Sequence, residues 1–243
     1  MEEASKLVEY QYSYTPTDLK ITSIASTVAK LREKVAPFRF KLAAREISKT
    51  LQLEAGDKVL ELGSGLGLLG EAIKDEVCGE VNYFALELAY KSAKSGLEKG
   101  LLGVHADVTN LPFPDNSFNA LVTNDVLEHI PSSEVVKEIH RVLKPNGKAF
   151  IVIADPSEAR FDYVHDHIDR ANSGTDVKYW EELFQKSGFK LLKIDSEKYR
   201  KRDWRKIFNL PLLVNLKDKP GFACAFNPVN RPGTYILSKE KLD

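Results

Sequence analysis

Short apolar runs and stretches with helical spacing alternate through the middle of the chain. The helical stretches carry apolar residues three or four positions apart, whereas the runs between them are continuous, as in buried strands. Strands that alternate with helices in this way are typical of a doubly wound, mostly parallel sheet. The predicted strands are 58–62, 81–87, 103–107, 118–124 and 148–154, and the predicted helices are 68–75, 88–99 and 132–143.

Both ends of the chain extend this α/β pattern. Helical spacing at 18–35 and 37–51 predicts a helical N-terminal arm over residues 1–50, which we expect to act as a lid. The remaining residues, 51–243, are expected to form one domain. A helix at 175–189 and strands at 190–198 and 234–241 bring the predicted sheet to seven strands. The long connection 199–233, before the last strand, is expected to form a substrate cap or an interface, for instance in a homodimer.

Composition narrows the class of protein further. The 243 residues include 35 Lys and Arg and 35 Asp and Glu, so the formal net charge is zero, which disfavours a polyanion as the main partner. No apolar run approaches the ~18 residues that a membrane span needs, so no membrane partner is expected. Two cysteines are too few for a disulfide framework, and the start of the chain lacks a signal-peptide pattern. We therefore expect a cytoplasmic protein.

A glycine-rich turn joins the first predicted strand to the following helix, in the sequence Glu61-Leu62-Gly63-Ser64-Gly65-Leu66-Gly67. Glycines permit a tight turn and a close approach of a ligand to the backbone, and the helix behind offers free N–H groups. Twenty residues after Gly67, Glu87 ends the second predicted strand, where a carboxylate can accept hydrogen bonds from ribose hydroxyls. The two features together predict a site for an adenosine-containing ligand.

Two classes of adenosine ligand compete for this site. A dinucleotide site requires a G-x-G-x-x-G/A turn, and Gly63, Gly65 and Leu68 do not complete it. The acidic Glu61 would also repel a diphosphate, whereas it suits a ligand with an ammonium and a sulfonium group. The residues therefore favour S-adenosylmethionine (SAM) over a nicotinamide cofactor and disfavour a dehydrogenase.

Four segments, in this order, resemble class I SAM-dependent methyltransferases, of the large family acting mostly on small molecules. They are VLELGSGLG (59–67), ALELAYKSA (85–93), HADVTNLPFPDNSFNALVTNDVLEHI (105–130) and EIHRVLKPNGKAFIVI (138–153). The resemblance spans about 56–154 without a gap. It implies the Rossmann-like methyltransferase fold, with SAM as cofactor and S-adenosylhomocysteine as product.

The resemblance also implies a role for individual cofactor-binding residues. The methionine portion of SAM would be wrapped by Glu61, Gly63, Ser64, Gly65 and Gly67. The ribose would be held by Glu87 and the adenine by Leu88, Asp107 and Val108. The methionine end and the transferred methyl would be bordered by Asn124, Asp125 and Val126.

The catalytic and substrate residues are less defined. Methyl transfer mainly needs alignment, and a general base helps only when the acceptor must lose a proton. Candidate bases or substrate contacts are His129, His165 and His167, although packing or a solvated loop explains them equally well. A His-x-His pair among acids is a loose metal signature, so no metal is assigned. Further substrate candidates are Tyr10, Tyr14, Arg200 and Trp204.

The most favoured function is methyl transfer to an oxygen or nitrogen of a small molecule. A basic stretch at 198–206, interleaved with Tyr199 and Trp204, suits an anionic small substrate, or RNA in an RNA or protein methyltransferase. Asn124-Asp125-Val126-Leu127 stands where many enzymes that methylate base nitrogens carry Asn/Asp-Pro-Pro-Tyr/Phe, so nucleobase amines are disfavoured. A non-catalytic SAM-binding regulatory protein is the remaining alternative.

Overall fold

The structure is a computed structural model that describes residues 38–130, 132–153, 177–192 and 234–240. Within these parts the strands form a seven-stranded sheet in the order β3-β2-β1-β4-β5-β7-β6. The β1–β2, β2–β3 and β4–β5 pairs are parallel, and β7 runs antiparallel to both β5 and β6. The predicted mostly parallel α/β sheet is confirmed.

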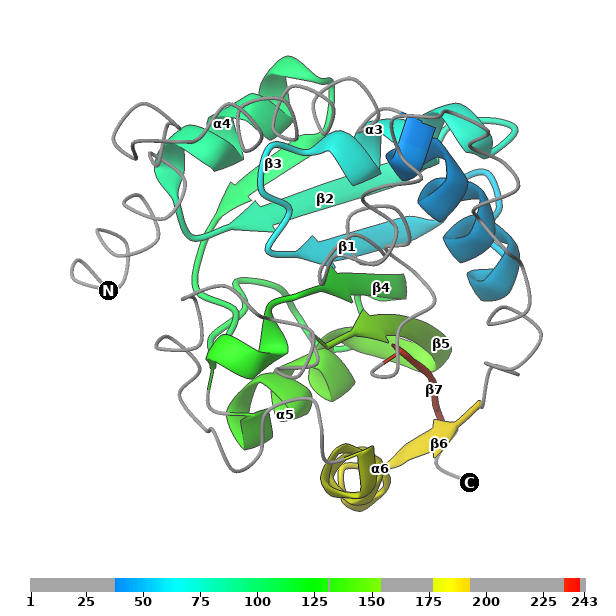
Figure 1. The fold of residues 1–243 in the computed structure, drawn as a ribbon, viewed down its shortest axis with the longest axis vertical. Helices are drawn as coiled ribbons and strands as arrows, with labels where there is room; N and C mark the ends of the chain where they lie inside the picture. Colours follow the sequence, from blue (N-terminus) through cyan, green and yellow to red (C-terminus); the bar gives the residue numbers. More distant parts are fainter. Residues whose placement is uncertain (1–37, 131, 154–176, 193–233, 241–243) are drawn as a thin grey trace, which may run out of the picture. The chain divides into compact units, whose positions relative to one another are not determined.

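The chain divides into two compact units, Met1–Pro114 and Asp115–Asp243, which we describe one at a time. In the first unit, a helix at 38–51 precedes three parallel strands that alternate with two helices (Figure 1). These elements are β1 (Lys58–Leu62), α3 (Leu68–Glu76), β2 (Asn82–Glu87), α4 (Tyr90–Glu98) and β3 (Leu102–His105).

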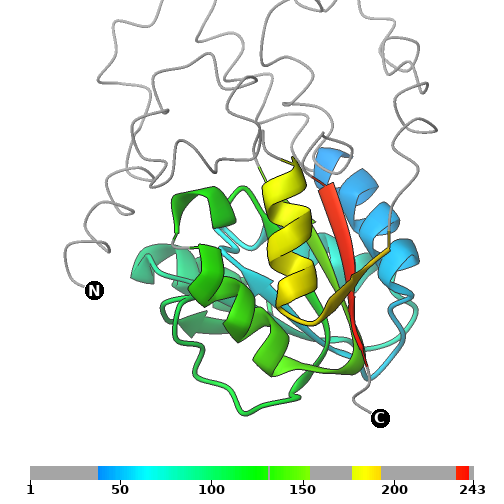
Figure 2. The ribbon, with the colours of Figure 1, turned by 90° about the horizontal axis from the view of Figure 1, so that it is seen from below.

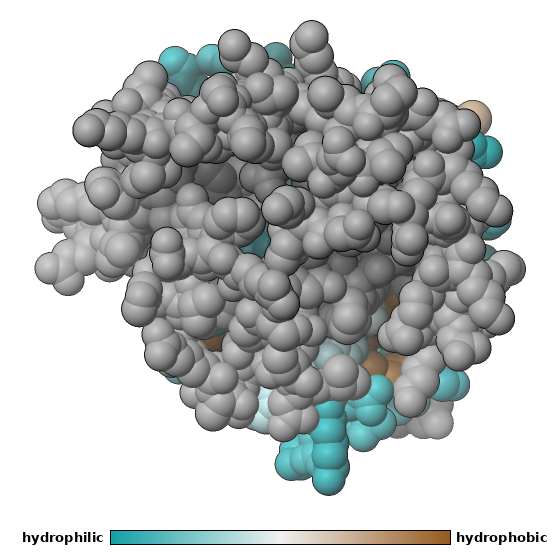
Figure 3. Space-filling view, in the orientation of Figure 1, coloured by the Kyte–Doolittle hydropathy of each residue, from teal (hydrophilic) through white to brown (hydrophobic). Residues whose placement is uncertain are grey.

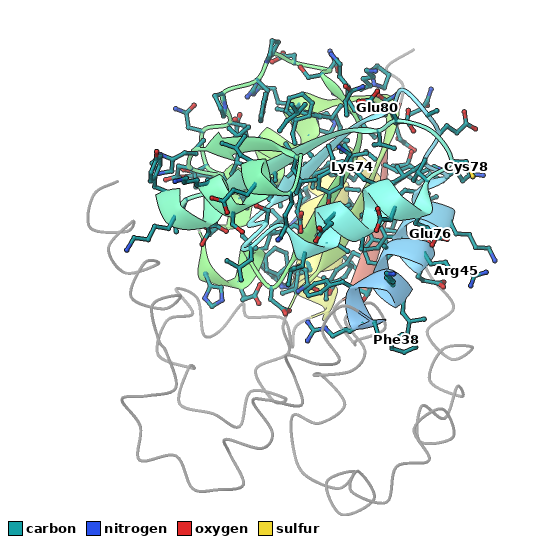
Figure 4. All side chains as sticks on the ribbon, turned by 90° about the horizontal axis from the view of Figure 1, so that it is seen from above. Phe38, Arg45, Lys74, Glu76, Cys78 and Glu80 are labelled. Carbon is teal, nitrogen blue, oxygen red and sulfur yellow. The ribbon has the colours of Figure 1, made fainter. Side chains whose placement is uncertain are left out.

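Two glycines let the helices of the first unit lie close to the strands. A Cβ added at Gly70 of α3 would come within 2.6 Å of the Tyr83 ring on β2, and one at Gly96 of α4 would lie 3.4 Å from Ala85. Close packing excludes water from the strands, so Tyr83, Ala85 and Val59 are almost completely buried. The helix 38–51 lies beside α3, where Arg45 and Glu76 approach to 3.9 Å (Figure 4).

The second unit contains four strands and two α-helices among its described residues. They are β4 (Phe118–Asn124), the 3₁₀ turn η1 (Leu127–His129), α5 (Ser132–Val142), β5 (Leu143–Val152), α6 (Val177–Lys186), β6 (Phe189–Leu191) and β7 (Thr234–Lys239). Figure 2 shows α6 alongside β7. Trp180 and Phe184 of α6 are buried, and the Phe184 ring lies 5.2 Å from that of Tyr235. Aromatic packing thus fixes α6 on the antiparallel end of the sheet.

A buried lysine on β7, Lys239, binds backbone carbonyls at the C-terminal end of α5. The Lys239 ammonium donates to Asn116 Oδ1 at 2.8 Å, to the His140 carbonyl at 2.9 Å and to the Leu143 carbonyl at 2.8 Å. Both carbonyls belong to the end of α5 and its continuation, where helices leave acceptors unpaired. Burial lowers the pKa of Lys239.

The observed elements follow the predicted ones, with one instructive difference. Strands β1 and β4 begin and end where the sequence places them. The strand predicted from Lys148 begins earlier, at Leu143. Strand pairing passes from Phe118–Leu143 to Ala120–Lys148, so β5 contains a bulge. The bulge includes the sequence Pro145-Asn146-Gly147, in which Asn146 has φ 65°.

Other predictions extend outside the described residues. The strand predicted at 190–198 is observed as Phe189–Leu191, and residues from 193 onward are outside. The helix at 18–35 and the connection 199–233 also lie there, so the arm, the cap and the boundary at residue 50 stay predictions. Most described atoms visible in Figure 3 are hydrophilic. Among the helices that the structure describes, none has the length and apolar character to cross a bilayer.

Candidate cofactor site

The glycine turn after β1 has a backbone that favours glycine at three positions. Gly63, Gly65 and Gly67 have φ values of 68°, 51° and 74°, in the left-handed region that other residues adopt only with strain. The N–H groups of Gly63 and Ser64 donate to the Leu86 carbonyl at 2.9 and 3.0 Å. These hydrogen bonds hold the turn against the end of β2, and α3 begins at the residue after Gly67.

Glu87, the last residue of β2, binds this turn through its side chain. Oε2 accepts a hydrogen bond from Gly65 N–H at 2.9 Å, and Oε1 accepts from the N–H groups of Leu88 at 2.9 Å and Ala89 at 3.1 Å. The residue is only 3% exposed. A carboxylate offers about four acceptor positions, so the three N–H donors hold Glu87 as a rigid acceptor beside the turn.

Two further features of the turn are an unpartnered hydroxyl and a close fit at Gly67. Ser64 Oγ is buried and has no hydrogen-bond partner among the described residues. A Cβ added at Gly67 would lie 3.0 Å from Leu101 Cδ1 and 3.1 Å from the backbone of Gly96, so the absence of a side chain keeps the turn compact. Buried polar atoms without a partner are rare in native proteins, and Ser64 is therefore suited to a ligand.

Glu61 lies at the end of β1, inside the first unit. Its Oε2 accepts a hydrogen bond from the Tyr83 hydroxyl at 3.1 Å. Burial raises the pKa of Glu61 to about 8; the Tyr83 hydrogen bond opposes this shift, and the nearby Glu87 charge adds to it. The sequence predicts a negative charge at Glu61, whereas a pKa of about 8 makes this side chain a largely neutral acid at pH 7.

The residues expected at the adenine lie after β2 and β3. Val108 is buried, and Asp107 Oδ1 accepts from Thr109 N–H at 2.9 Å and from Thr109 Oγ1 at 2.8 Å. The Leu88 carbonyl lies 2.9 Å from His105 Nε2. His105 is not among the residues predicted from the sequence, although it ends β3, two positions before Asp107.

In the second unit, the predicted residues after β4 form a tight irregular segment. Asn124 Nδ2 donates to Asp125 Oδ2 at 2.9 Å. Asp125 has φ 55°, an uncommon conformation for a residue other than glycine and one that is frequent at functional sites. His129 ends η1 and is partly exposed, whereas its neighbour Glu128 is buried. His129 is among the residues predicted from the sequence, whereas the buried Glu128 is not.

The other candidate residues have no structural description here. Outside the described residues lie His165, His167, Tyr10, Tyr14, Arg200 and Trp204. Their roles stay predictions. Within the described ranges, no group of three or more His, Cys, Asp or Glu side chains could hold a metal ion.

The fold and site define an α/β protein of the nucleotide-binding type. Its parallel strands β1 and β2 are joined by a glycine turn and a helix, and a carboxylate at the end of β2 contacts the turn. Residues 60–151 match a family model described as a methyltransferase domain. This segment therefore matches a methyltransferase domain, in agreement with the resemblance to class I methyltransferases, a class that uses SAM as its methyl donor.

Curated relatives and solved structures agree with this assignment. The chain is 33% identical over 162 residues to sterol methyltransferase-like 1 of Botryococcus braunii, a match that covers 60% of this chain and 41% of the relative. It is 35% identical over 117 residues to the demethylmenaquinone methyltransferase of Lactobacillus johnsonii, covering 44% of this chain and 48% of the relative. The chain thus spans less than half the length of these relatives.

Among solved structures, the fold resembles that of a complex between the Haloferax volcanii Trm112 methyltransferase activator and a methyltransferase. The TM-score is 0.59 with 17% identity, and the match covers 87% of this chain and 95% of the other. At this identity the likeness concerns the fold. The residues of the glycine turn and Glu87 fit SAM, because they combine a compact backbone turn, an open acceptor and the orphan hydroxyl of Ser64.

Proposed function

We propose that this protein transfers a methyl group from SAM to an oxygen or nitrogen atom of a small molecule. The observation that carries the proposal is the contact between Glu87 and the glycine turn, in which Oε2 accepts from Gly65 N–H at 2.9 Å. This contact puts a fixed carboxylate beside a turn whose backbone can approach a ligand. Such an acceptor suits the vicinal hydroxyls of a ribose.

Bound SAM supplies a methyl group that is already activated on a positively charged sulfur. The work left to this chain is to orient the cofactor and acceptor for an in-line displacement and to exclude water. Glu87 and the turn would fix the nucleoside and the methionine portion. His129 would take a proton from an acceptor that must lose one, and an acceptor without such a proton would need no base.

A small acceptor is supported by the relatives, whose names refer to sterol and demethylmenaquinone rather than to a macromolecule. The basic residues at 198–206 would favour an anionic group on that acceptor. The same stretch suits RNA in the second candidate function, an RNA or protein methyltransferase. We also expect a cytoplasmic location and allow for a homodimer, both from the sequence.

The proposal is tested by following S-adenosylhomocysteine production with panels of small hydroxyl, amine and apolar ring compounds, and identifying the methylated atom by NMR. Turnover with an oxygen or nitrogen acceptor would support it, and methylation only at carbon would overturn the choice of atom. Turnover on RNA that is lost when Arg200, Lys201 and Arg202 are replaced by Ala would favour the second candidate. SAM binding without turnover on any panel would favour a regulatory protein.

A further inference from the structure

A buried pair of titratable side chains lies on β1 and β2, where the glycine turn begins. Tyr83 of β2 and Glu61 of β1 are 1% and 5% exposed, and the Tyr83 hydroxyl donates to Glu61 Oε2 at 3.1 Å. The Tyr83 ring is confined by α3, since a Cβ added at Gly70 would come within 2.6 Å of it. The hydroxyl is therefore held at a fixed place beside the carboxyl group.

Glu61 and Glu87 lie on the same face of two neighbouring strands. Glu61 pairs with Ala85, and Glu87 follows two residues later on β2, so both side chains point to the same side of the sheet. Glu87 is surrounded by three N–H donors, whereas one hydroxyl donor contacts Glu61. The Glu87 charge disfavours a second charge on Glu61, which has a single hydroxyl donor to stabilise it.

Among the described residues of the first unit, none of the groups that act on the Glu61 pKa is a cation. Tyr83 and Glu87 are the titratable groups that face it from β2. On α3, Glu71 and Asp75 are exposed, and Lys74 donates to the Gly100 carbonyl at 2.7 Å. Burial and the Glu87 charge outweigh the Tyr83 hydrogen bond and raise the pKa of Glu61 to about 8.

We propose that Tyr83 is a positioning residue for the cofactor site: it orients Glu61, a neutral acid in the free protein, and Glu61 releases its proton to solvent when the cationic methionine end of SAM binds. The inference rests on SAM being the cofactor of this site. The sulfonium and ammonium groups favour the ionised form of Glu61, so binding lowers its pKa. The O–H bond of the carboxylic acid breaks, its electron pair stays on oxygen, and the buffer takes the proton.

The coupling between SAM binding and the ionisation of Glu61 determines how SAM affinity changes with pH. A ligand that binds the ionised form more tightly gains affinity as the pH rises toward the pKa of the free protein, and the gain stops above that value. Removing the Tyr83 hydroxyl removes the one hydrogen bond that lowers the pKa of Glu61. In Tyr83→Phe, the rise of SAM affinity with pH is therefore expected to occur at higher pH, in addition to any general loss of affinity.

The test is isothermal titration calorimetry of SAM with the full chain, from pH 6 to 9, in two buffers of different protonation enthalpy. Wild type is expected to release about 0.8 proton more than Glu61→Gln at pH 7. The α-amino group of the ligand titrates near pH 8 in every variant, so the difference from Glu61→Gln isolates Glu61. In Tyr83→Phe the midpoint of proton release moves to higher pH, and the control Tyr179→Phe on α6 keeps the wild-type profile.

The possible results distinguish a failure of this proposal from a failure of SAM as the cofactor. SAM binding to wild type with the same proton release as Glu61→Gln, or with a profile that Tyr83→Phe leaves unmoved, would overturn the proposal while leaving SAM as the cofactor. If Glu61→Gln or Tyr83→Phe does not fold, the wild-type profile alone decides: binding without proton release between pH 6 and 8 overturns it. No binding of SAM to wild type would contradict the cofactor itself, and the proposal with it.

Discussion

Replacing Gly70 by Ala tests the packing that fixes Tyr83 against Glu61. Gly70 lies inside α3, and a Cβ built there comes within 2.6 and 2.8 Å of two Tyr83 ring atoms and 2.9 Å of Leu101. The Tyr83 ring is buried and planar, so it cannot give way as the end of a flexible side chain could. The methyl group must therefore displace the ring or the helix.

The expected loss of stability is the balance of two opposing effects. Replacing a mid-helix glycine by alanine stabilises a helix by roughly 0.5–1 kcal/mol, and overpacking a core destabilises it by roughly 1–3 kcal/mol. Gly70→Ala should thus lower the free energy of unfolding by about 1–2 kcal/mol. Gly96→Ala in α4 is the matched control, because its Cβ meets Ala85 at an ordinary 3.4 Å, and it should be neutral or stabilising by up to about 1 kcal/mol.

Urea unfolding followed by circular dichroism measures both variants against wild type. Because the Tyr83 hydroxyl moves with its ring, Gly70→Ala should also weaken SAM binding, whereas Gly96→Ala should leave the dissociation constant close to the wild-type value. Equal urea midpoints for Gly70→Ala and Gly96→Ala, with unchanged dependence of the unfolding free energy on urea, would contradict the predicted clash between residue 70 and Tyr83. A stabilised Gly70→Ala would refute it more strongly.

Three further substitutions probe the rest of the structure. Lys239→Met leaves three oxygen atoms without their donor, of which the Leu143 carbonyl is buried, so unfolding experiments should show a loss of about 1–3 kcal/mol. Gly67→Ala forces a side chain into a φ of 74° and to 3.0 Å from Leu101, and calorimetry should show SAM binding at least roughly tenfold weaker. Glu61→Gln removes a group whose raised pKa favours the fold at low pH and loses that contribution as the pH rises from 4.5 through about 8, so wild type should lose up to roughly 5 kcal/mol relative to the variant across this window.

Each of these expectations has a contradicting result. A Lys239→Met protein as stable as wild type would mean that the three acceptors find other donors. Unchanged SAM affinity in Gly67→Ala would separate this glycine from the cofactor site. Parallel stability curves for wild type and Glu61→Gln between pH 5 and 8 would show that Glu61 ionises normally in the folded protein.

The cofactor half of the fold was predictable because its signals are local. Strand β1 ends at the glycine turn, and the left-handed φ values of Gly63, Gly65 and Gly67 explain why glycine occurs at these positions. Glu87 could be singled out because it ends the strand that follows. The sequence could also place β4 residue by residue, since it is a continuous apolar run between polar turns.

The predictions that missed depend on contacts between distant residues. Nothing near Glu61 in the sequence shows that Tyr83, 22 positions away, donates to it and that burial makes it a weak acid. The early start of β5 likewise depends on pairing with Phe118, which allows a bulge where the Pro-Asn-Gly sequence predicts a turn. The acceptor pocket is expected to involve the arm and the connection 199–233, and their sequences carry no family motif that would identify its residues.

The most direct test of a SAM site at the glycine turn is the titration of SAM into the full chain and into Glu87→Ala. Glu87 is the one acceptor that binds Gly65 N–H in the turn and also ends β2. We predict saturable binding of one SAM per chain in wild type and binding at least roughly tenfold weaker in Glu87→Ala, with the circular dichroism spectrum unchanged. Equal affinity in the two proteins, or no binding to wild type, would contradict the assignment of this site.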